Sequence, residues 1–498
     1  MHPQGTQPKL MSAQCAAAPA SRAVLCLVLL CALGTACARA PQRTPVAGVP
    51  TSASWVAGSQ THDQVLDSWW TVFNDADLTR TVQEATQANL DLRRFLARLD
   101  AAAAQARMAG APLWPGVDMA AGSQRQQQVF VGLPIPGREG EPLTSRSTLH
   151  ALSFNLSWEL DLWGRLRAGQ RAALAEVQAS EEDYRAALLS VAGQTVRLWL
   201  AAAEGHRQRE LAQATARSFE VTAHQVRERY ERGLRSALDL RLALNNEAVA
   251  NALVNLRERE LEGLTRQLEV LLGRYPAGQL AVSESLPDLP GPLPAGLPST
   301  LLERRPDLVA AERRLAATLA RVHEAKAALL PRISLTATGG RTSAELEDLL
   351  SSQFSVWSLA GNLAQPLFHG GRLQAHLDLS EARAREAVEH YRLAALRAFG
   401  EVETALAAEA WLERRETDLS EAVEQSRAAL RLAEDRYRLG LIDFVTLMET
   451  QRSAFSAESQ LIQVRRQRLE NRVDLCLALG GGFPADAVPR MAHARAGG

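Results

Sequence analysis

Several features that often carry function are scarce in this sequence. Lysine occurs only at Lys9 and Lys326 although the chain has 55 basic residues, and the formal net charge is −1. A chain with balanced charge gives no reason to expect a nucleic acid as a partner. The motifs GxxxxGK[ST], HExxH and a GxSxG between strand and helix are missing, and the ten histidines are scattered. We therefore expect no enzyme activity, no cofactor and no metal site.

Cysteine is scarce as well, with five in the whole chain. Cys15, Cys26 and Cys31 lie in a segment that we expect to be removed, so the mature chain keeps only Cys37 and Cys476. This number predicts no intrachain disulfide and no cysteine metal cluster. Because Cys476 stands alone in a helical pattern, we expect it to be a small core residue.

The chain contains one notable apolar run, AVLCLVLLCALG at residues 23–34. This run is too short for a comfortable membrane helix, and the positive Arg22 precedes it. This arrangement is typical of a secretory signal peptide, here residues 1–36. The start codon corresponds to Met1 or to Met11, since the residues before Met11 add nothing to the signal.

The small residues GTAC follow the apolar run and end at Cys37. They resemble the lipobox of bacterial lipoproteins, although Leu33 lies one position further from the cysteine than usual. We expect Cys37 to be a lipid anchor in the outer-membrane lipid. An ordinary signal peptide cleaved near Ala36 is the alternative.

The rest of the chain contains two copies of one unit. Gly164-Arg165-Leu166 recurs as Gly371-Arg372-Leu373, Gly233 as Gly440, and Leu272-Gly273 as Leu479-Gly480, always at the same offset. Upstream, Asp91-Leu92 recurs as Asp307-Leu308 at a slightly larger offset, which indicates a gap, and thus a loop, between about 122 and 150. The expected organisation is an irregular segment 37–75, repeat one 76–273, a proline-rich linker 274–302, repeat two 303–482 and a tail 483–498.

Each copy has the same order of expected elements. A helix (76–111 and 303–330) ends near a proline, and two short runs of alternating apolar and polar residues follow, such as 153–161 and 332–338. Long tracts without proline (143–275 and 367–483) then predict long helices. From Leu373 to Ala405, small or apolar residues recur in steps of four and three, which is the pattern of a coiled coil.

Glycines divide each long tract unequally. The interval from Gly164 to Gly233 equals that from Gly371 to Gly440, and the intervals that follow, to Gly273 and Gly480, are equal to each other but much shorter. If Gly233 and Gly440 are hairpin tips, each hairpin has a long and a short arm. The helix that precedes each tract, 76–111 or 303–330, is about as long as the part of the long arm that the short arm leaves uncovered. It can therefore stack end to end with the short arm beside the long arm. Glycine suits such turns because it tolerates positive φ.

Four strands of roughly 9–12 residues suit a tilted membrane crossing. Four strands cannot close a barrel, so the chain must oligomerise. A dimer gives eight strands, whose barrel is filled by its own side chains, and a trimer gives twelve, which can leave a lumen. A soluble sheet with one wet face is the alternative. The aromatic residues that could form an interfacial girdle are Phe130, Trp158, Trp163, Phe354, Trp357 and Phe368.

Five segments resemble one known family. They are WWTVFNDADL (69–78), ERRPDLVAAERRLA (303–316), AKAALLPRISL (325–335), PLFHGGRL (366–373) and LALGGGF (477–483). Together these segments resemble the TolC-like outer-membrane efflux proteins, specifically the NodT-like lipoprotein branch that serves resistance-nodulation-division (RND) pumps. The resemblance spans about residues 65–482.

The resemblance implies a mainly α fold with membrane β-structure. Three chains form one 12-stranded outer-membrane β-barrel, which continues as a long periplasmic α-helical barrel. The far end of this tunnel is nearly closed at rest and docks on a periplasmic adaptor that is bound to an inner-membrane pump. The implied function is export of small molecules through the outer membrane in a tripartite efflux system.

The resemblance also assigns residues to roles. The adaptor contacts fall on Arg232, Gly233, Leu234, Ser236, Leu439, Gly440 and Leu441. The constriction falls on Val445 and Glu449, where relatives usually carry leucine and aspartate; three Glu449 side chains form an acidic ring that favours cations. Asp239 and Asp443 are candidates to pair with Arg235 or Arg452 and to hold the tips shut.

Two alternatives stay open at this stage. The same architecture serves type I protein secretion, and a non-porous, lipid-anchored periplasmic coiled-coil scaffold is a structural rival. The sequence names neither the exported substrate nor the adaptor and pump.

Overall fold

The structure, a computed structural model of the 498-residue chain, describes residues 52, 54–57, 68–130, 143–291 and 298–482. All of them belong to one unit, Pro41–Gly498. The expected signal peptide (1–36), the expected lipid anchor Cys37 and the tail 483–498 lie outside the described residues.

The first copy opens with two helices rather than the single helix expected over 76–111. Helices α2 (Ala76–Ala88) and α3 (Leu90–Gly110) meet at Asn89, whose ψ of 130° is not helical. The Asn89 side chain accepts hydrogen bonds from the backbone N–H groups of Asp91 and Leu92 and thereby caps α3. The expectation of one helix is wrong because a cap residue interrupts an otherwise helical pattern.

The second copy breaks at the equivalent point. Helices α6 (Pro298–Arg304) and α7 (Pro306–Ala327) are separated by Arg305, which has extended backbone. Proline disfavours helical backbone in the residue before it, so Pro306 starts a new helix. The single helix expected over 303–330 is therefore also wrong.

Asn89 and Arg305 occupy equivalent positions in the two copies. At each break, the side chain donates a hydrogen bond to a carbonyl in the last turn of a later helix. Asn89 Nδ2 donates to the carbonyl oxygen of Leu271 at 2.8 Å. Arg305 Nη1 donates at 3.2 Å to the carbonyl oxygen of Ala478, which is the counterpart of Leu271 in the second copy. The two copies thus keep one contact with different side chains.

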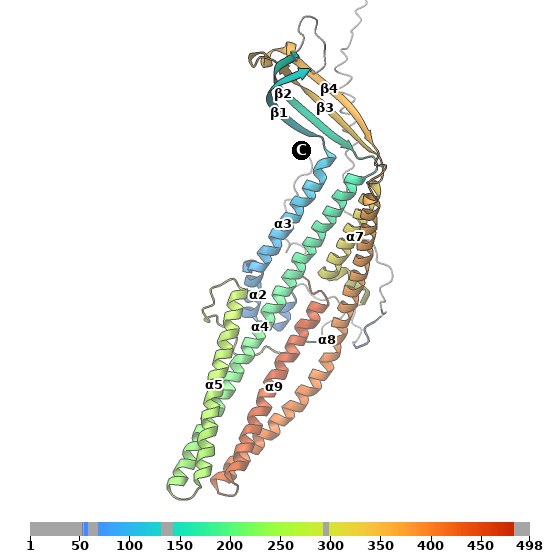
Figure 1. Ribbon diagram of the computed structural model, residues 1–498. Coiled ribbons are helices and arrows are strands. Elements are labelled where there is room, and N and C mark those ends of the chain that lie inside the picture. The colour runs from blue at the N-terminus through green and yellow to red at the C-terminus, as the bar shows by residue number, and fades with distance from the viewer. Residues whose placement is uncertain (1–51, 53, 58–67, 131–142, 292–297, 483–498) are drawn as a thin grey trace, which may run out of the picture. The chain divides into compact units, whose positions relative to one another are not determined.

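Four long helices form two hairpins (Figure 1). The long arms α4 (Arg165–Glu231) and α8 (Arg372–Arg438) have 67 residues each, and the short arms α5 (Ala237–Leu271) and α9 (Phe444–Ala478) have 35 residues each. At ~1.5 Å per residue, a long arm spans about 100 Å. One stretch of α4 is apolar enough to span a membrane, but 67% of it is buried, as in a core helix.

The helices contact one another in a fixed order. Toward the hairpin tips the order is α5, α4, α9, α8, and toward the sheet it is α3, α4, α7, α8. Helices α3 and α5 therefore form one flank, which we call the first flank. Helix α8 forms the opposite one, the second flank.

The largest apolar core lies where the helices of both copies meet, and it includes Trp69, Trp199, Leu268 and Leu475. Trp69 and Trp70 are buried and in edge-to-face contact. Cys476 is buried, as expected, and burial raises the pKa of its thiol to about 12.

The strands form one antiparallel sheet in the order β1-β2-β3-β4. They are β1 (Gly116–Phe130), β2 (Leu143–Leu160), β3 (Arg332–Ser343) and β4 (Ser355–Ala364). Strands β1 and β2, with 15 and 18 residues, exceed the expected length because their pairing continues as far as Phe130 and Leu143. Short 3₁₀ helices complete the described elements: η1 (Trp69–Phe73), η2 (Ala111–Leu113), η3 (Glu347–Leu350) and η4 (Ser352–Phe354).

The register of the sheet separates an apolar face from a polar face. Phe154 lies opposite Met119 and Gly339, and Gly339 lies opposite Trp357. One residue further along β2, the other face carries a polar row. This row consists of Asp118, Asn155, Thr338 and Ser358. The period-two pattern of the sequence therefore becomes a two-faced sheet, with β1 and β4 as its outer strands.

Candidate docking tips and constriction

The first tip is a tight turn that glycine makes possible. Helix α4 ends at Glu231, and Gly233 follows with a φ of 73°. The Gly233 N–H donates to the Tyr230 carbonyl, and the Leu234 N–H donates to the Arg229 carbonyl, both at 2.8 Å. This pair of bonds is a Schellman motif, which satisfies the last carbonyls of the helix. It leaves the Leu234 side chain exposed to solvent.

The second tip repeats this geometry. Gly440 has a φ of 74°, and its N–H donates to the Tyr437 carbonyl at 3.1 Å. The Leu441 N–H donates to the Arg436 carbonyl at 2.9 Å. Leu439 and Leu441 are exposed. The structure therefore presents two similar turns, each with exposed leucine.

The short arms begin at different caps. Ser236 and Asp239 form a capping box: the Asp239 N–H donates to Ser236 Oγ at 3.1 Å, and the Ser236 N–H donates to Asp239 Oδ2 at 3.4 Å. In the second hairpin, Asp443 Oδ1 accepts from the Thr446 N–H at 2.8 Å. This contact with Thr446, followed by the charge of Arg235, lowers the pKa of Asp443.

Arg229 joins the two tips directly. Its Nη1 donates to the carbonyl oxygen of Tyr437, and its Nη2 to that of Arg438, both at 3.2 Å. Its guanidinium lies 4.9 Å from the centre of the Tyr437 ring, and that of Arg235 lies at 5.1 Å. A basic side chain of the first hairpin thus binds the carboxyl end of α8, where the helix dipole favours positive charge.

Tyr437 is the centre of a small core between the hairpins. Its ring is buried and lies 6.2 Å from that of Phe444, with Phe219 and Leu447 in the same cluster. Burial raises the pKa of Tyr437, and the positive charges of Arg235 and Arg229 oppose this rise. The two tips are therefore held together by an apolar centre with two guanidinium groups around it.

Val445 and Glu449 lie one helical turn apart on α9, and both are exposed. Arg452 Nη1 is 3.8 Å from Glu449, and Arg452 Nη2 donates to Asn246 Oδ1 at 2.6 Å. Asn246 Nδ2 in turn approaches Met448 Sδ at 3.1 Å. Among the described residues, Arg452 is thus the basic neighbour of the Glu449 carboxylate, at a long ion-pair distance.

The expected closing charges have other partners within the chain. Asp239 and Asp443 serve as helix caps, Arg235 lies over Tyr437, and Arg452 contacts Glu449 and Asn246. Among the described residues, neither aspartate forms an ion pair with Arg235 or Arg452. Within a single chain, these groups stabilise the tips by capping and stacking.

Aromatic residues gather where the sheet meets the helices and along β4. Trp158 Nε1 donates to the Leu113 carbonyl at 3.0 Å, and Trp163 Nε1 donates to the Pro331 carbonyl at 2.7 Å. Trp357 and Phe368 are exposed. An apolar ring with a satisfied polar end is what a membrane–water boundary favours.

Sequence reasoning missed Arg229 and Tyr437 as functional candidates. Both belong to the repeated Arg-Tyr pair, Arg229-Tyr230 and Arg436-Tyr437, so a signal was present. It could not show that the first arginine and the second tyrosine contact each other.

Comparisons with known proteins agree with this architecture. A family model described as "Outer membrane efflux protein" matches residues 81–274 and 297–481. The chain is 33% identical over 470 residues to the "Pyoverdine export outer membrane protein OpmQ" of Pseudomonas putida, with 94% of this chain and 99% of that protein covered. It is 36% identical over 470 residues to the "Outer membrane protein OprJ" of Pseudomonas aeruginosa, with 92% and 96% covered.

A solved structure has the same fold. The outer-membrane channel OprN matches with a TM-score of 0.81 at 29% identity, with 90% of this chain and 99% of that chain covered. Helical hairpins joined to a four-stranded sheet are therefore shared with a known channel.

Proposed function

The chain belongs to the outer membrane efflux protein family, and from this membership we propose that three copies form the outer-membrane channel of a tripartite efflux system. Its relatives are outer-membrane components of efflux pumps, and this chain has the same role. The main support for a trimer comes from the two flanks of the chain. The first flank connects to the outer strand β1 and the second flank to the outer strand β4.

With its two flanks, each chain can form one segment of the wall of a ring-shaped channel. Strand β1 leads from α3 on the first flank, and β4 leads into α8 on the second flank. Both outer strands therefore have backbone groups available to a neighbouring copy, and no open edge is tolerated in lipid. Pairing of β4 with the next copy's β1 closes a ring, because a head-to-tail contact repeats until the rotation closes. Three copies give twelve strands.

The apolar face of the sheet supports a place in lipid. Leu359 and Trp357 of β4 and Met119 of β1 are exposed on this face. The opposite polar row, which includes Asn155 and Thr338, then lines the lumen. This assignment follows because lipid-facing and lumen-facing residues alternate in membrane strands.

The hairpin tips serve as the docking site for the periplasmic adaptor. Exposed Leu234, Leu439 and Leu441 stand beside rigid, capped turns, with Arg232 and Ser236 close to the first glycine. Apolar side chains on a fixed backbone suit a helical partner, since little order is lost on binding. Three copies present six such turns.

Val445 and Glu449 form the constriction just inside the tips. Three Glu449 carboxylates close together make an acidic ring that favours cations. Arg235, Arg452, Asp239 and Asp443 lie around this ring and form the contacts between copies that keep it narrow at rest. Adaptor binding needs to supply only a few kcal/mol to shift such an equilibrium.

The inner-membrane partner is an RND-type pump, and a lipid on Cys37 anchors the channel. The support for both is the resemblance of the sequence segments to the lipoprotein branch of the family. The cysteine follows an apolar run that is too short to span the membrane.

The decisive experiment is reconstitution of the purified chain. We expect a trimer in detergent and ion conductance in planar bilayers. A monomer that stays in the aqueous phase without detergent would exclude the channel.

Efflux is separated from protein secretion in a strain that lacks its own outer-membrane channels. Expression of this chain with an RND pump and adaptor is expected to restore resistance to small toxic compounds. Restoration of type I protein secretion instead would contradict the proposal.

A further inference from the structure

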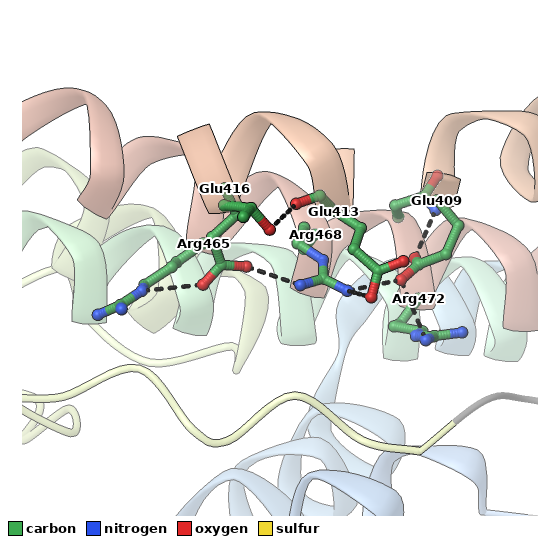
Figure 2. A network of polar contacts seen from close by, with 8 residues as sticks. Glu409, Glu413, Glu416, Arg465, Arg468 and Arg472 are labelled. Atoms are coloured by element: carbon green, nitrogen blue, oxygen red, sulfur yellow. Dashed lines mark hydrogen bonds and ion pairs between the residues drawn. The ribbon is translucent and has the colours of Figure 1, made fainter. Parts of the chain in front are cut away.

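A cluster of charged side chains lies between the arms of the second hairpin (Figure 2). Glu409 of α8 accepts from Arg468 Nη2 and Arg472 Nη2 of α9, each at 3.1 Å, and from Asn471 Nδ2 at 3.2 Å. The side chains of Arg468 and Arg472 are only 13% and 8% exposed. Two largely buried arginines thus lie against one carboxylate.

The cluster extends along α8 by two further turns. Glu416 accepts from Arg468 Nη1 at 2.8 Å and from Arg465 Nε at 3.1 Å. Glu413 lies 3.7 Å from Arg468. Burial alone would lower the pKa of Arg468, but its hydrogen bonds to Glu416 and Glu409 and their charges raise it. The cluster therefore holds its charges together within the helix packing.

The first hairpin has no charged residue at the positions equivalent to Glu409, Arg468 and Arg472. At the constant offset between the copies, Glu409, Arg468 and Arg472 correspond to Ala202, Leu261 and Thr265. These three residues are all buried. The repeat thus offers an internal comparison, in which equivalent positions hold two arms together by apolar contact in one hairpin and by ion pairs in the other.

Buried ion pairs are seldom the more stable solution. Replacing them with well-packed apolar residues is often neutral or stabilising, whereas removing one partner leaves an uncompensated buried charge at a high cost. An ionic contact therefore differs from an apolar one mainly in that a change at a single carboxylate can release it.

We propose that Glu409, Arg468 and Arg472 form an ionic clasp that holds the arms of the second hairpin together and opens when Glu409 is neutralised. The first hairpin has apolar contact in place of this clasp. The second hairpin can thus separate its arms locally while the first stays closed. The clasp does not depend on the proposed export function, since it lies within one chain.

Amide hydrogen exchange on the full chain in detergent tests the clasp, because exchange reports local opening. Glu409→Gln is expected to speed exchange in 402–416 and 465–475 by at least about tenfold, since it removes the carboxylate that the largely buried Arg472 contacts and leaves Arg468 with Glu416 and Glu413 only. The equivalent segments 195–209 and 258–268 are expected to be unchanged. Glu424→Gln, at an exposed glutamate of the same helix, is the control.

The transplant Glu409→Ala/Arg468→Leu/Arg472→Thr gives the second hairpin the residues of the first. It is expected to restore slow exchange to the level of the unmodified chain or below. The clasp is overturned if Glu409→Gln changes exchange no more than Glu424→Gln does. It is also overturned if the transplant exchanges as fast as Glu409→Gln, because the loss would then reflect damaged packing and not an unpaired charge.

Discussion

Tyr230 and Tyr437 occupy the same position in the two copies, yet their environments are opposite. Tyr437 is 1% exposed and lies against the guanidinium groups of Arg229 and Arg235, whereas Tyr230 is 42% exposed. Within one chain, basic residues of the first hairpin therefore cover Tyr437, in the small core between the hairpins. This contact joins the tips within each chain, so it bears on how the tips open.

Arg229→Ala is expected to loosen the tips. It removes two hydrogen bonds to carbonyls at the end of α8 and a cation–π contact, which together stabilise the fold by about 1–3 kcal/mol. The measurements are the thermal unfolding midpoint and the leak conductance, which should fall and rise, respectively. The control is Arg227→Ala, at an exposed arginine of the same helix. Equal effects of both variants would show that the contact has no special role.

Gly440→Pro is expected to abolish efflux and to leave trimers intact. The proline ring holds φ at a negative value, whereas Gly440 has a φ of 74°, and the N–H that donates to Tyr437 is lost. Efflux in a complemented strain and native electrophoresis are the two measurements. Loss of trimers would mean that the tip is structural and not a docking site.

Gly233→Glu extends this same prediction to the first tip, in the same assays. A Cβ at Gly233 meets nothing within 4 Å, so a glutamate has space to extend into solvent where the adaptor docks, although the φ of 73° strains any side chain there. We expect efflux to be lost and the trimer to be kept. Gly233→Gln, which has nearly the same size and the same strained φ of 73° but no charge, is the control and should keep more efflux. Normal efflux by Gly233→Glu would remove this tip from the docking surface.

Glu449→Gln is expected to reduce the cation preference of the channel, and Glu449→Ala is expected to raise its leak conductance as well. The first change removes charge at constant size, and the second also removes bulk. Arg452→Gln should shift selectivity the opposite way, since it removes the positive neighbour 3.8 Å away. Reversal potentials in planar bilayers measure the effect. Unchanged currents in all three variants would place Glu449 outside the constriction.

The variants Leu359→Arg and Ser358→Arg test which face of β4 contacts lipid and which lines the lumen. Leu359 lies on the apolar face and Ser358 in the polar row. Arginine at the lipid midplane costs about 2–4 kcal/mol, so Leu359→Arg should reduce the amount of assembled trimer in the outer membrane. Ser358→Arg should assemble normally and alter conductance. The reverse result would exchange the lipid and lumen faces.

The buried Cys476 should respond to pH through its raised pKa. Its thiol titrates near 9 when unfolded and at about 12 in the folded chain. Stability from this group is fully present below pH 9 and is lost as pH rises toward 12, because only the unfolded state gains the thiolate in this window. The free energy of unfolding, measured by denaturant titration between about pH 8 and pH 11, should therefore fall more steeply with pH in the unmodified chain than in Cys476→Ala. Parallel curves would contradict the shift.

The sequence by itself determined the repeat, the two glycine turns and the two-faced strands. These follow from local chemistry: Gly233 and Gly440 adopt positive φ that other residues avoid, and alternation along β2 and β3 sorts side chains by face. The core position of Cys476 was expected because this cysteine stands alone in a helical pattern. The family resemblance added the channel role, which the comparisons confirm.

Only the tertiary structure decided how the two copies differ. Asn89 and Arg305 interrupt helices because each contacts a distant carbonyl, on Leu271 or Ala478, that no local pattern reveals. The polar half of β1 becomes a strand because β2 pairs with it, although its own sequence alternates weakly. The contact of Arg229 with Tyr437 has the same origin. Each depends on which surfaces meet after folding, and a repeat in sequence does not specify those surfaces.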